Sequence, residues 1–132
     1  MNNPPTVLKV LYVEDDPDIQ TIARIALEDI GKFTVRACES GAEALAAIED
    51  FVPDLMLLDV MMPAMDGPTL LTHLRKTDNG ASSKVIFMTA RVQQSEVQQY
   101  LALGAVDVIA KPFDPLTLAE QIVNIINRST DP

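Results

Sequence analysis

The sequence has few of the features that mark disulfide-stabilised, secreted or membrane proteins. Its single cysteine, Cys38, cannot form an internal disulfide and suits a reducing compartment. No apolar run approaches the roughly eighteen residues that a membrane-spanning helix needs. The first residues also lack the charged and apolar regions of a secretory signal. We therefore expect an intracellular, cytoplasmic protein that does not bind the membrane.

Basic residues and phosphate-binding loops are also scarce. The chain has 10 lysine and arginine residues against 19 acidic residues, which gives a formal net charge of −9. Direct binding to nucleic acid needs clustered basic side chains that neutralise phosphates, so it is not expected. The sequence contains neither GxGxxG nor GxxxxGKS or GxxxxGKT, which argues against a nucleotide-binding α/β domain.

The chain does have enough apolar sequence to form a core. Hydrophobic residues make up 48% of its 132 residues and charged residues 22%, which is typical of a globular protein. This length fits a single domain over residues 1–132 and is short for two. We expect the core to span about residues 7–127, with frayed ends at Met1–Thr6 and Arg128–Pro132 and no output domain hidden between them.

Five short apolar runs recur along the chain, at Val7–Val13, Thr34–Cys38, Leu55–Asp59, Val85–Thr89 and Val106–Ala110. Three of them coincide with the stretches VLYV, LMLLDV and VIFMTA, which are almost continuously apolar, as in parallel strands covered on both faces. The segments between the runs carry apolar residues at helical spacing. This alternation predicts an α/β fold with an open, doubly wound, mostly parallel sheet of five strands and helices on both faces.

The ends of the expected helices are also marked in the sequence. The expected N-caps are Asp16, Ser40, Ser95 and Asp114, and the expected helix ends are Gly31 and Gly104. On the last helix, the core-facing stripe is expected at Leu118, Ala119, Ile122, Val123 and Ile126. Leu116 and Ile125 fall off this stripe, so we expect them to contact a partner.

Polar side chains gather where the predicted strands end. Glu14, Asp15 and Asp16 follow the first strand, Asp59 ends the third, Thr89 and Ala90 end the fourth, and Lys111 and Pro112 follow the fifth. In an open parallel sheet these ends lie along one edge, and ligands bind there at the point where the strand order reverses. We therefore expect these residues to form one site.

The chemistry of this set favours a phosphoryl group. The carboxylates of Glu14, Asp15 and Asp59 would repel one another unless a cation lay between them, and such oxygen ligands suit Mg²⁺. Lys111 adds a compact positive charge and Thr89 a hydroxyl. A phosphoryl group could therefore be received here, with Asp59 as the nucleophile and an aspartyl phosphate as the product.

Four pieces of the sequence resemble the receiver domain of two-component response regulators, which has a chemotaxis-regulator-like fold. They are VEDDP, LLDVMMPAMDG, MTA and AKPF, in that order, and the resemblance covers about residues 7–127. The spacings also match the family without a gap, with 44 residues from Asp15 to Asp59, 30 from there to Thr89 and 22 more to Lys111. The resemblance implies the flavodoxin-like strand order 2-1-3-4-5.

The resemblance also implies a role for each matching position. Asp59 would accept a phosphoryl group from a histidine kinase or a phosphotransfer protein, in the presence of Mg²⁺ or Mn²⁺. Asp15 would bind the metal directly, Glu14 would act mainly through a water, and Met61 would contribute its main-chain carbonyl. The implied phosphoryl-binding and switch residues are Thr89, Ala90, Val108 and Lys111, and the Lys111–Pro112 bond would be cis. Asp16 would cap the first helix instead of binding metal.

Three positions bear on signal output and lifetime. Receiver domains that signal usually have an aromatic residue three positions before the lysine, where this sequence has Val108. A β-branched side chain has one stiff torsion, so Val108 cannot swing as a ring does. We therefore expect the signal to pass through the loop after Thr89. Met61 and Arg91 would flank the phosphoryl group and tune its lifetime.

The expected output is altered binding of a partner and not turnover of a substrate, apart from self-phosphorylation and autodephosphorylation. The resemblance implies that a downstream protein or a second copy would bind the face formed by the fourth helix, the fifth strand and the fifth helix. His73 is expected on the surface with no phosphotransfer role, and Cys38 is expected to be a buried, inert residue.

Other functions fit some of the same residues. Adjacent aspartates after a strand are commonly a cap or a turn, and a lysine before a proline can simply be solvated. Phosphatases of the haloacid dehalogenase type also use an aspartate at a strand end, but Met61 stands where they need a second aspartate. A pseudo-receiver that binds partners without being phosphorylated remains an alternative because of Val108.

Overall fold

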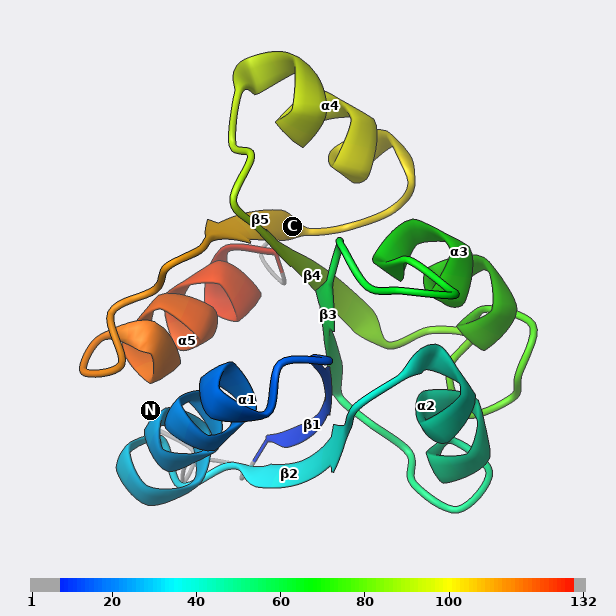
Figure 1. The fold of residues 1–132 in the computed structure, drawn as a ribbon, viewed down its shortest axis with the longest axis horizontal. Helices are drawn as coiled ribbons and strands as arrows, with labels where there is room; N and C mark the ends of the chain where they lie inside the picture. Colours follow the sequence, from blue (N-terminus) through cyan, green and yellow to red (C-terminus); the bar gives the residue numbers. More distant parts are fainter. Residues whose placement is uncertain (1–7, 130–132) are drawn as a thin grey trace.

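Strands and helices alternate along residues 8–129, which are the residues described by the structure, a computed structural model (Figure 1). The strands are β1 (Lys9–Val13), β2 (Thr34–Cys38), β3 (Leu55–Asp59), β4 (Lys84–Thr89) and β5 (Asp107–Ala110). The helices are α1 (Pro17–Arg24), which continues as the π-helical segment η1 (Ile25–Ile30), α2 (Gly41–Ala47), α3 (Gly67–Leu74), α4 (Gln94–Ala102) and α5 (Leu118–Ser129). Neighbouring strands pair in parallel in the order β2-β1-β3-β4-β5, which confirms the predicted fold.

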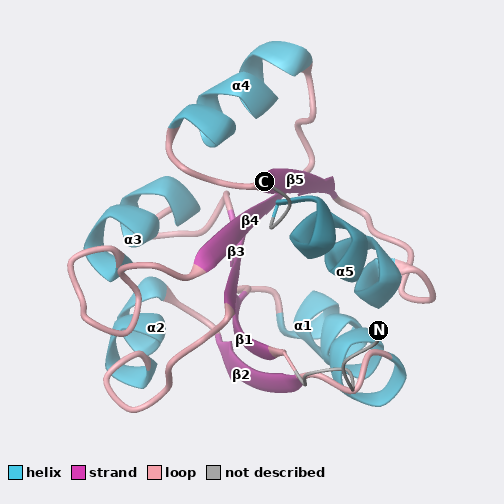
Figure 2. Cartoon of the chain, turned by 180° about the vertical axis from the view of Figure 1, so that it is seen from behind, coloured by secondary structure: helices cyan, strands magenta, loops and turns pink. Residues whose placement is uncertain are grey.

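Helices cover both faces of the sheet, and each face has its own apolar core (Figures 1 and 2). α1, η1 and α5 cover one face, where Val10 and Tyr12 of β1 are fully buried. α2 and α3 cover the other face, where Leu11 and Val13 of the same strand are fully buried. Successive strand side chains point to opposite faces. The near-continuous apolar runs in the sequence therefore reflect burial on both sides.

α4 is the most loosely packed helix on the sheet, and it stands away from the other helices in Figure 1. None of its residues is buried. Its main contact with the core is Tyr100, whose ring centroid lies 5.3 Å from that of Phe87 in β4. The helix ends as expected at Gly104, which follows it with a φ of 106°. None of the helices within residues 8–129 is both long and apolar enough to cross a membrane.

The strand order creates a switch point at the centre of the sheet. The chain passes from β1 outward to β2 and then returns to β3 on the other side of β1. α1 and α2 therefore lie on opposite faces, and the loops after β1 and β3 diverge from the same edge. Glu14 directly follows β1 and Asp59 ends β3, so two distant parts of the sequence meet there.

Two of the four predicted N-caps act as expected. Asp16 and Ser40 cap α1 and α2 with their side chains, as expected. The prediction for Ser95 was wrong, because α4 begins at Gln94 and Gln93, which makes no side-chain capping hydrogen bond, is at the N-cap position. Asp114 lies before the turn that precedes α5, and its carboxylate accepts the Leu116 N–H bond at 2.9 Å within that turn. Short polar residues favour turns and caps alike, so the sequence could not distinguish the two.

The last helix also differs from the prediction. α5 extends to Ser129, and Arg128 pairs with Asp107 at 3.2 Å, so the chain is not frayed at Arg128. Ile125 is buried and Val123 is exposed, which reverses their predicted positions. Leu116 is exposed, as expected. The predicted frayed segment Met1–Thr6 and the start of the first predicted strand, Val7, lie outside the described residues, as do residues 130–132.

The first helical segment ends at Gly31 as predicted, but not because this glycine needs a left-handed backbone. Gly31 has a φ of −81°, and Lys32 after it has a φ of 62°. A Cβ on Gly31 would lie 2.7 Å from the Cβ of Ala119 in α5 and 2.9 Å from the carbonyl oxygen of Leu27. Gly31 therefore permits a close approach of α5, and Lys32 carries the backbone strain.

We expect substitutions at these two neighbours to change stability in opposite directions. Lys32→Gly should raise the free energy of unfolding by about 1 kcal/mol, because a left-handed backbone costs other residues roughly that much. Gly31→Ala should lower it by about 1–3 kcal/mol, because the new methyl group overlaps α5. Urea unfolding followed by circular dichroism measures both. Changes of the same sign would contradict this account.

Candidate functional site

Three carboxylates meet at the carboxyl ends of β1 and β3. One oxygen each of Glu14, Asp15 and Asp59 lies within 4.8 Å of the other two. They converge because β1 and β3 are neighbours at the switch point, although 44 residues separate Asp15 from Asp59 in the sequence. Clustered carboxylate oxygens are the ligands that Mg²⁺ takes in proteins, so the donor set fits such an ion.

Lys111 bridges two of these carboxylates. Its Nζ donates hydrogen bonds to Glu14 Oε1 and to Asp59 Oδ1, both at 3.0 Å. The side chains of Glu14, Asp59 and Lys111 are only 1%, 3% and 17% exposed, so solvent screens these ion pairs little. The Lys111 N–H also donates to the Thr89 carbonyl at 2.9 Å, which ties the residue to the end of β4. The Lys111–Pro112 bond is cis, the isomer that the resemblance implied.

The site has less positive than negative charge. Burial raises the pKa of Glu14 above its usual value, and Lys111 partly offsets this effect. Burial likewise raises the pKa of Asp59, and the neighbouring charge of Asp15 raises it further. For Lys111, burial favours the neutral form, but the hydrogen bonds to the two carboxylates outweigh burial and raise its pKa. Lys111 therefore stays charged, yet one ammonium balances only one of three carboxylates.

Two residues that sequence analysis did not single out hold the backbone of the site. Gln20 Nε2 in α1 donates to the Glu14 carbonyl at 3.2 Å, and also to the carbonyl that ends β2 at 3.0 Å. Gly67, the first residue of α3, lies against the backbone of Asp59. A Cβ there would be 2.5 Å from the Asp59 carbonyl oxygen. In the sequence, the pair Asp66–Gly67 could have indicated this close approach, because an N-cap residue is followed there by a residue without a side chain.

A buried phenol belongs to the same region. Tyr12 is fully buried, and its hydroxyl has no hydrogen-bond partner within the described part of the chain. Burial raises the pKa of Tyr12, and the nearby charges of Glu14 and Asp59 raise it further. In the sequence, Tyr12 is only one more apolar strand residue, so periodicity could not reveal that it is near the charges of Glu14 and Asp59.

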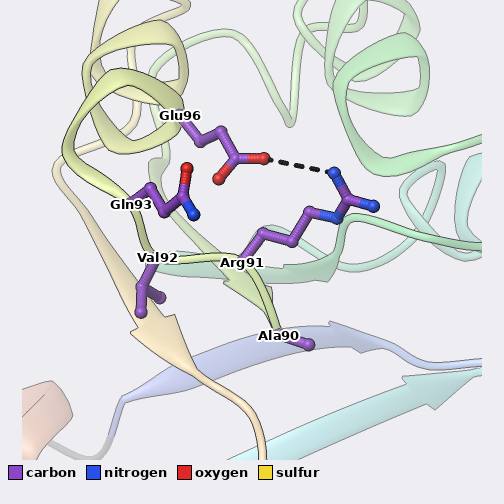
Figure 3. Close-up of a pocket in the computed structure, with 5 residues that line it drawn as sticks. All are labelled: Ala90, Arg91, Val92, Gln93 and Glu96. Carbon is purple, nitrogen blue, oxygen red and sulfur yellow. Dashed lines mark ion pairs between the residues drawn. The ribbon is translucent and has the colours of Figure 1, made fainter.

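The other side of the site is the loop from β4 to α4. Thr89 is buried, and its Oγ1 accepts a hydrogen bond from the Arg91 N–H at 3.0 Å. The Arg91 guanidinium lies 3.6 Å from the carboxylate of Glu96 in α4 (Figure 3). Ala90 is exposed at the end of β4. Arg91 in this loop therefore contacts both Thr89 at the site and Glu96 of α4.

The remaining predicted positions lie on several different elements of the fold. Val108 is half-buried in β5, opposite Phe87 of β4. Met61 is exposed in the loop after β3. His73 is exposed on α3. Cys38 is buried, and burial raises the pKa of its thiol to about 11, which agrees with an inert residue.

Comparison with known proteins identifies the family. Residues 10–123 match the response regulator receiver domain. The chain is 42% identical over 105 residues to the probable C4-dicarboxylate response regulator DctR of Priestia megaterium, covering 79% of this chain and 45% of that protein. The chain spans about half the length of several other curated relatives as well.

Solved structures with the same fold are receiver proteins too. The chemotaxis protein CheY4 of Vibrio cholerae has a TM-score of 0.82 and 28% identity, covering 91% of this chain and 99% of that one. The receiver domain of sensor histidine kinase PA1611 from Pseudomonas aeruginosa has a TM-score of 0.78 and 28% identity, covering 92% and 99%. That structure has a magnesium ion coordinated in its active-site cleft. The sequence motifs, the order of the strands and these matches together show that this chain belongs to the response regulator receiver domain family of two-component signalling.

Proposed function

We propose that phosphorylation of Asp59 switches this protein and that the phosphorylation requires Mg²⁺ or Mn²⁺. We also propose that residues 1–132 form a single receiver domain. The supporting observation is the convergence of three carboxylates with Lys111 at the β1–β3 edge. Asp15 and Asp59 would bind the ion directly, Glu14 mainly through a water, and Met61 through its main-chain carbonyl. The donor would be a histidine kinase or a phosphotransfer protein in the cytoplasm.

The residues of the site have separate tasks in this reaction. An oxygen of Asp59 forms the new bond to phosphorus while the bond from phosphorus to the donor's imidazole nitrogen breaks. A divalent cation held by the three carboxylates would supply positive charge for the phosphoryl oxygens. Lys111 would then pair with one of these oxygens. The Thr89 hydroxyl accepts the hydrogen bond from the Arg91 N–H through a lone pair. Its own proton therefore stays free to be donated to another phosphoryl oxygen.

An apolar hollow next to the site is suited to the protein that donates the phosphoryl group. It has a volume of about 400 Å³ and lies between α1 and the loop after β5. Ile19, Ile22 and Phe113 line it, and Lys111 lines it as well, so the hollow is continuous with the phosphoryl-binding groups. The apolar face of a helix that carries the phosphohistidine would cover these side chains while its imidazole reaches Asp59.

Labelling with a small phosphodonor tests the proposed function. The protein should gain one phosphoryl group from acetyl phosphate in the presence of Mg²⁺, as measured by intact mass spectrometry. Addition of a chelator should prevent the gain. If the protein gains no phosphoryl group even with Mg²⁺, it is instead a pseudo-receiver, the alternative that Val108 suggested.

We expect the signal to leave the site through the loop after β4. A phosphoryl group adds charge and acceptor oxygens beside Thr89, and Phe87 on the same strand contacts Tyr100 of α4. Beryllofluoride with Mg²⁺ should therefore shift the backbone amide signals of residues 89–97 strongly and those of residues 106–110 weakly. NMR spectra with and without this mimic measure both. Shifts that stop at Arg91 would show that the domain does not switch by this route.

The surface proposed to receive the output is the face of α4, β5 and α5. Leu116, just before α5, is exposed and remains a candidate contact. Ile125 is not, because it is buried in the core. A downstream protein or a second copy would bind this face after the α4 loop has moved.

A further inference from the structure

Arg91 is held at both of its ends. Its backbone N–H donates to Thr89 Oγ1 at 3.0 Å, and its guanidinium Nη1 lies 3.6 Å from Glu96 Oε2. Figure 3 shows the Arg91 side chain leaving the loop and the Glu96 side chain reaching down from α4 to meet it. The two residues line a hollow of about 350 Å³ together with Ala90, Val92 and Gln93. The loop between β4 and α4 is thus closed by an ion pair.

The ion pair joins two unequal partners. The side chain of Arg91 is 74% exposed, whereas that of Glu96 is 23% exposed. Glu96 belongs to the first turn of α4, where a negative charge is favourable to the helix. Arg91 belongs to a loop and has a long side chain, so Arg91 is the partner that can move.

A phosphoryl group on Asp59 would attract the same guanidinium. It carries about 1.5 to 2 negative charges and three acceptor oxygens, and guanidinium groups bind such oxygens in pairs. Arg91 follows Thr89 by two residues and is bonded to its hydroxyl, so the loop begins at the edge of the site. Among the described side chains of the site, Lys111 faces three carboxylates, so a further cation is favourable there even beside the proposed metal ion. Glu96 and the phosphoryl group therefore compete for Arg91.

We propose that Glu96 is a positioning residue that holds Arg91 away from Asp59, and that the phosphoryl group must displace Glu96 to recruit this arginine. This inference rests on the proposed function of Asp59. Its consequence is that Glu96 weakens binding of a phosphoryl group and couples that binding to the first turn of α4. Release of Glu96 on phosphorylation frees the first turn of α4, a helix with no buried residue.

The expected effect follows from the strength of exposed ion pairs. A stronger ion pair between Arg91 and Glu96 leaves a smaller fraction of molecules in which Arg91 is free. The affinity for an anion that needs the free Arg91 falls in proportion to that fraction. Double-mutant cycles give exposed pairs a strength that corresponds to about a 1.4- to 5-fold change in an equilibrium constant. Glu96→Gln should therefore raise the affinity for a phosphoryl mimic by about that factor.

The experiment is a titration of the full chain with beryllofluoride in excess Mg²⁺, followed by amide NMR. Glu96→Gln should bind the mimic more tightly than the wild type, and Glu96→Asp, which retains the charge, should restore part of the wild-type affinity. In an Arg91→Ala background, Glu96→Gln should have no effect. The gain from Glu96→Gln should also shrink at high salt, because both partners of the ion pair reach solvent.

A control separates the ion pair from net charge. Glu120→Gln removes one exposed acid from α5 and should leave the affinity unchanged. An equal gain from Glu120→Gln, or a gain from Glu96→Gln that persists without Arg91, would overturn the proposed role of Glu96. Failure of the wild type to bind the mimic, or binding that survives Asp59→Asn, would instead overturn the proposed function.

Discussion

An Asp59→Asn protein should incorporate no phosphoryl group from acetyl phosphate, even in excess Mg²⁺. The amide is not a nucleophile, and it cannot supply a charged oxygen to a metal. The neighbouring Glu14 is unsuited to take over, because its carboxylate accepts bonds from Lys111 and from the Asp16 N–H. Intact mass spectrometry measures the loss, which should be complete because Asp59 alone is expected to carry the label.

A matched substitution controls for the change in charge. Asp29 is an exposed acid on η1, at the far end of the first helical segment from the site. Asp29→Asn should be labelled to the same extent as the wild type. A label that remains in Asp59→Asn would place the acceptor elsewhere and remove the central assignment.

Asp15→Asn should make the protein more stable than the wild type without metal and less stable than the wild type with Mg²⁺. Without metal, the variant should be more stable by about 1 kcal/mol, because one of three repelling charges within 4.8 Å is gone. With Mg²⁺ at about 100 times its dissociation constant, the wild type should gain about 2.7 kcal/mol and the variant almost nothing. Urea unfolding in the presence of Mg²⁺ or of a chelator measures both free energies.

Asp16, the next residue along the chain, provides the control for Asp15→Asn. Asp16 caps α1 through the Asp18 and Ile19 N–H groups, and asparagine caps a helix equally well. Asp16→Asn should therefore leave both the fold and the stabilisation by Mg²⁺ intact. If Asp15→Asn keeps the full stabilisation by Mg²⁺, the ion binds at another place.

Some errors of sequence interpretation have a common physical cause. The run from Ile122 to Ile126 contains four apolar residues in five positions, so two different helical stripes fit it equally well. Contact with the sheet selects the stripe of Leu118, Ile122 and Ile125, because these side chains follow one another along one face. The caps of α4 and α5 were ambiguous for a similar reason, since polar residues before a helix suit several starting points.

The sequence by itself determined the fold and which residues meet at one edge of the sheet. Apolar runs such as LMLLDV require burial on both faces and therefore a parallel sheet between helices. Once that sheet is accepted, carboxylates at the ends of its strands must share one edge. Asp15, Asp59, Thr89 and Lys111 were therefore identifiable as a set, because their placement depends only on the ends of strands.

Only the tertiary structure decided which side chains touch. Lys111 bonds to Glu14 as well as Asp59, Gln20 ties α1 to β1, and Gly31 admits Ala119 of α5. Each of these contacts joins elements whose separation and rotation depend on how the whole core packs. The pattern of apolar residues specifies which face of an element is buried. It does not specify the last few ångströms between two side chains, and those distances decide whether they form a hydrogen bond, an ion pair or a clash.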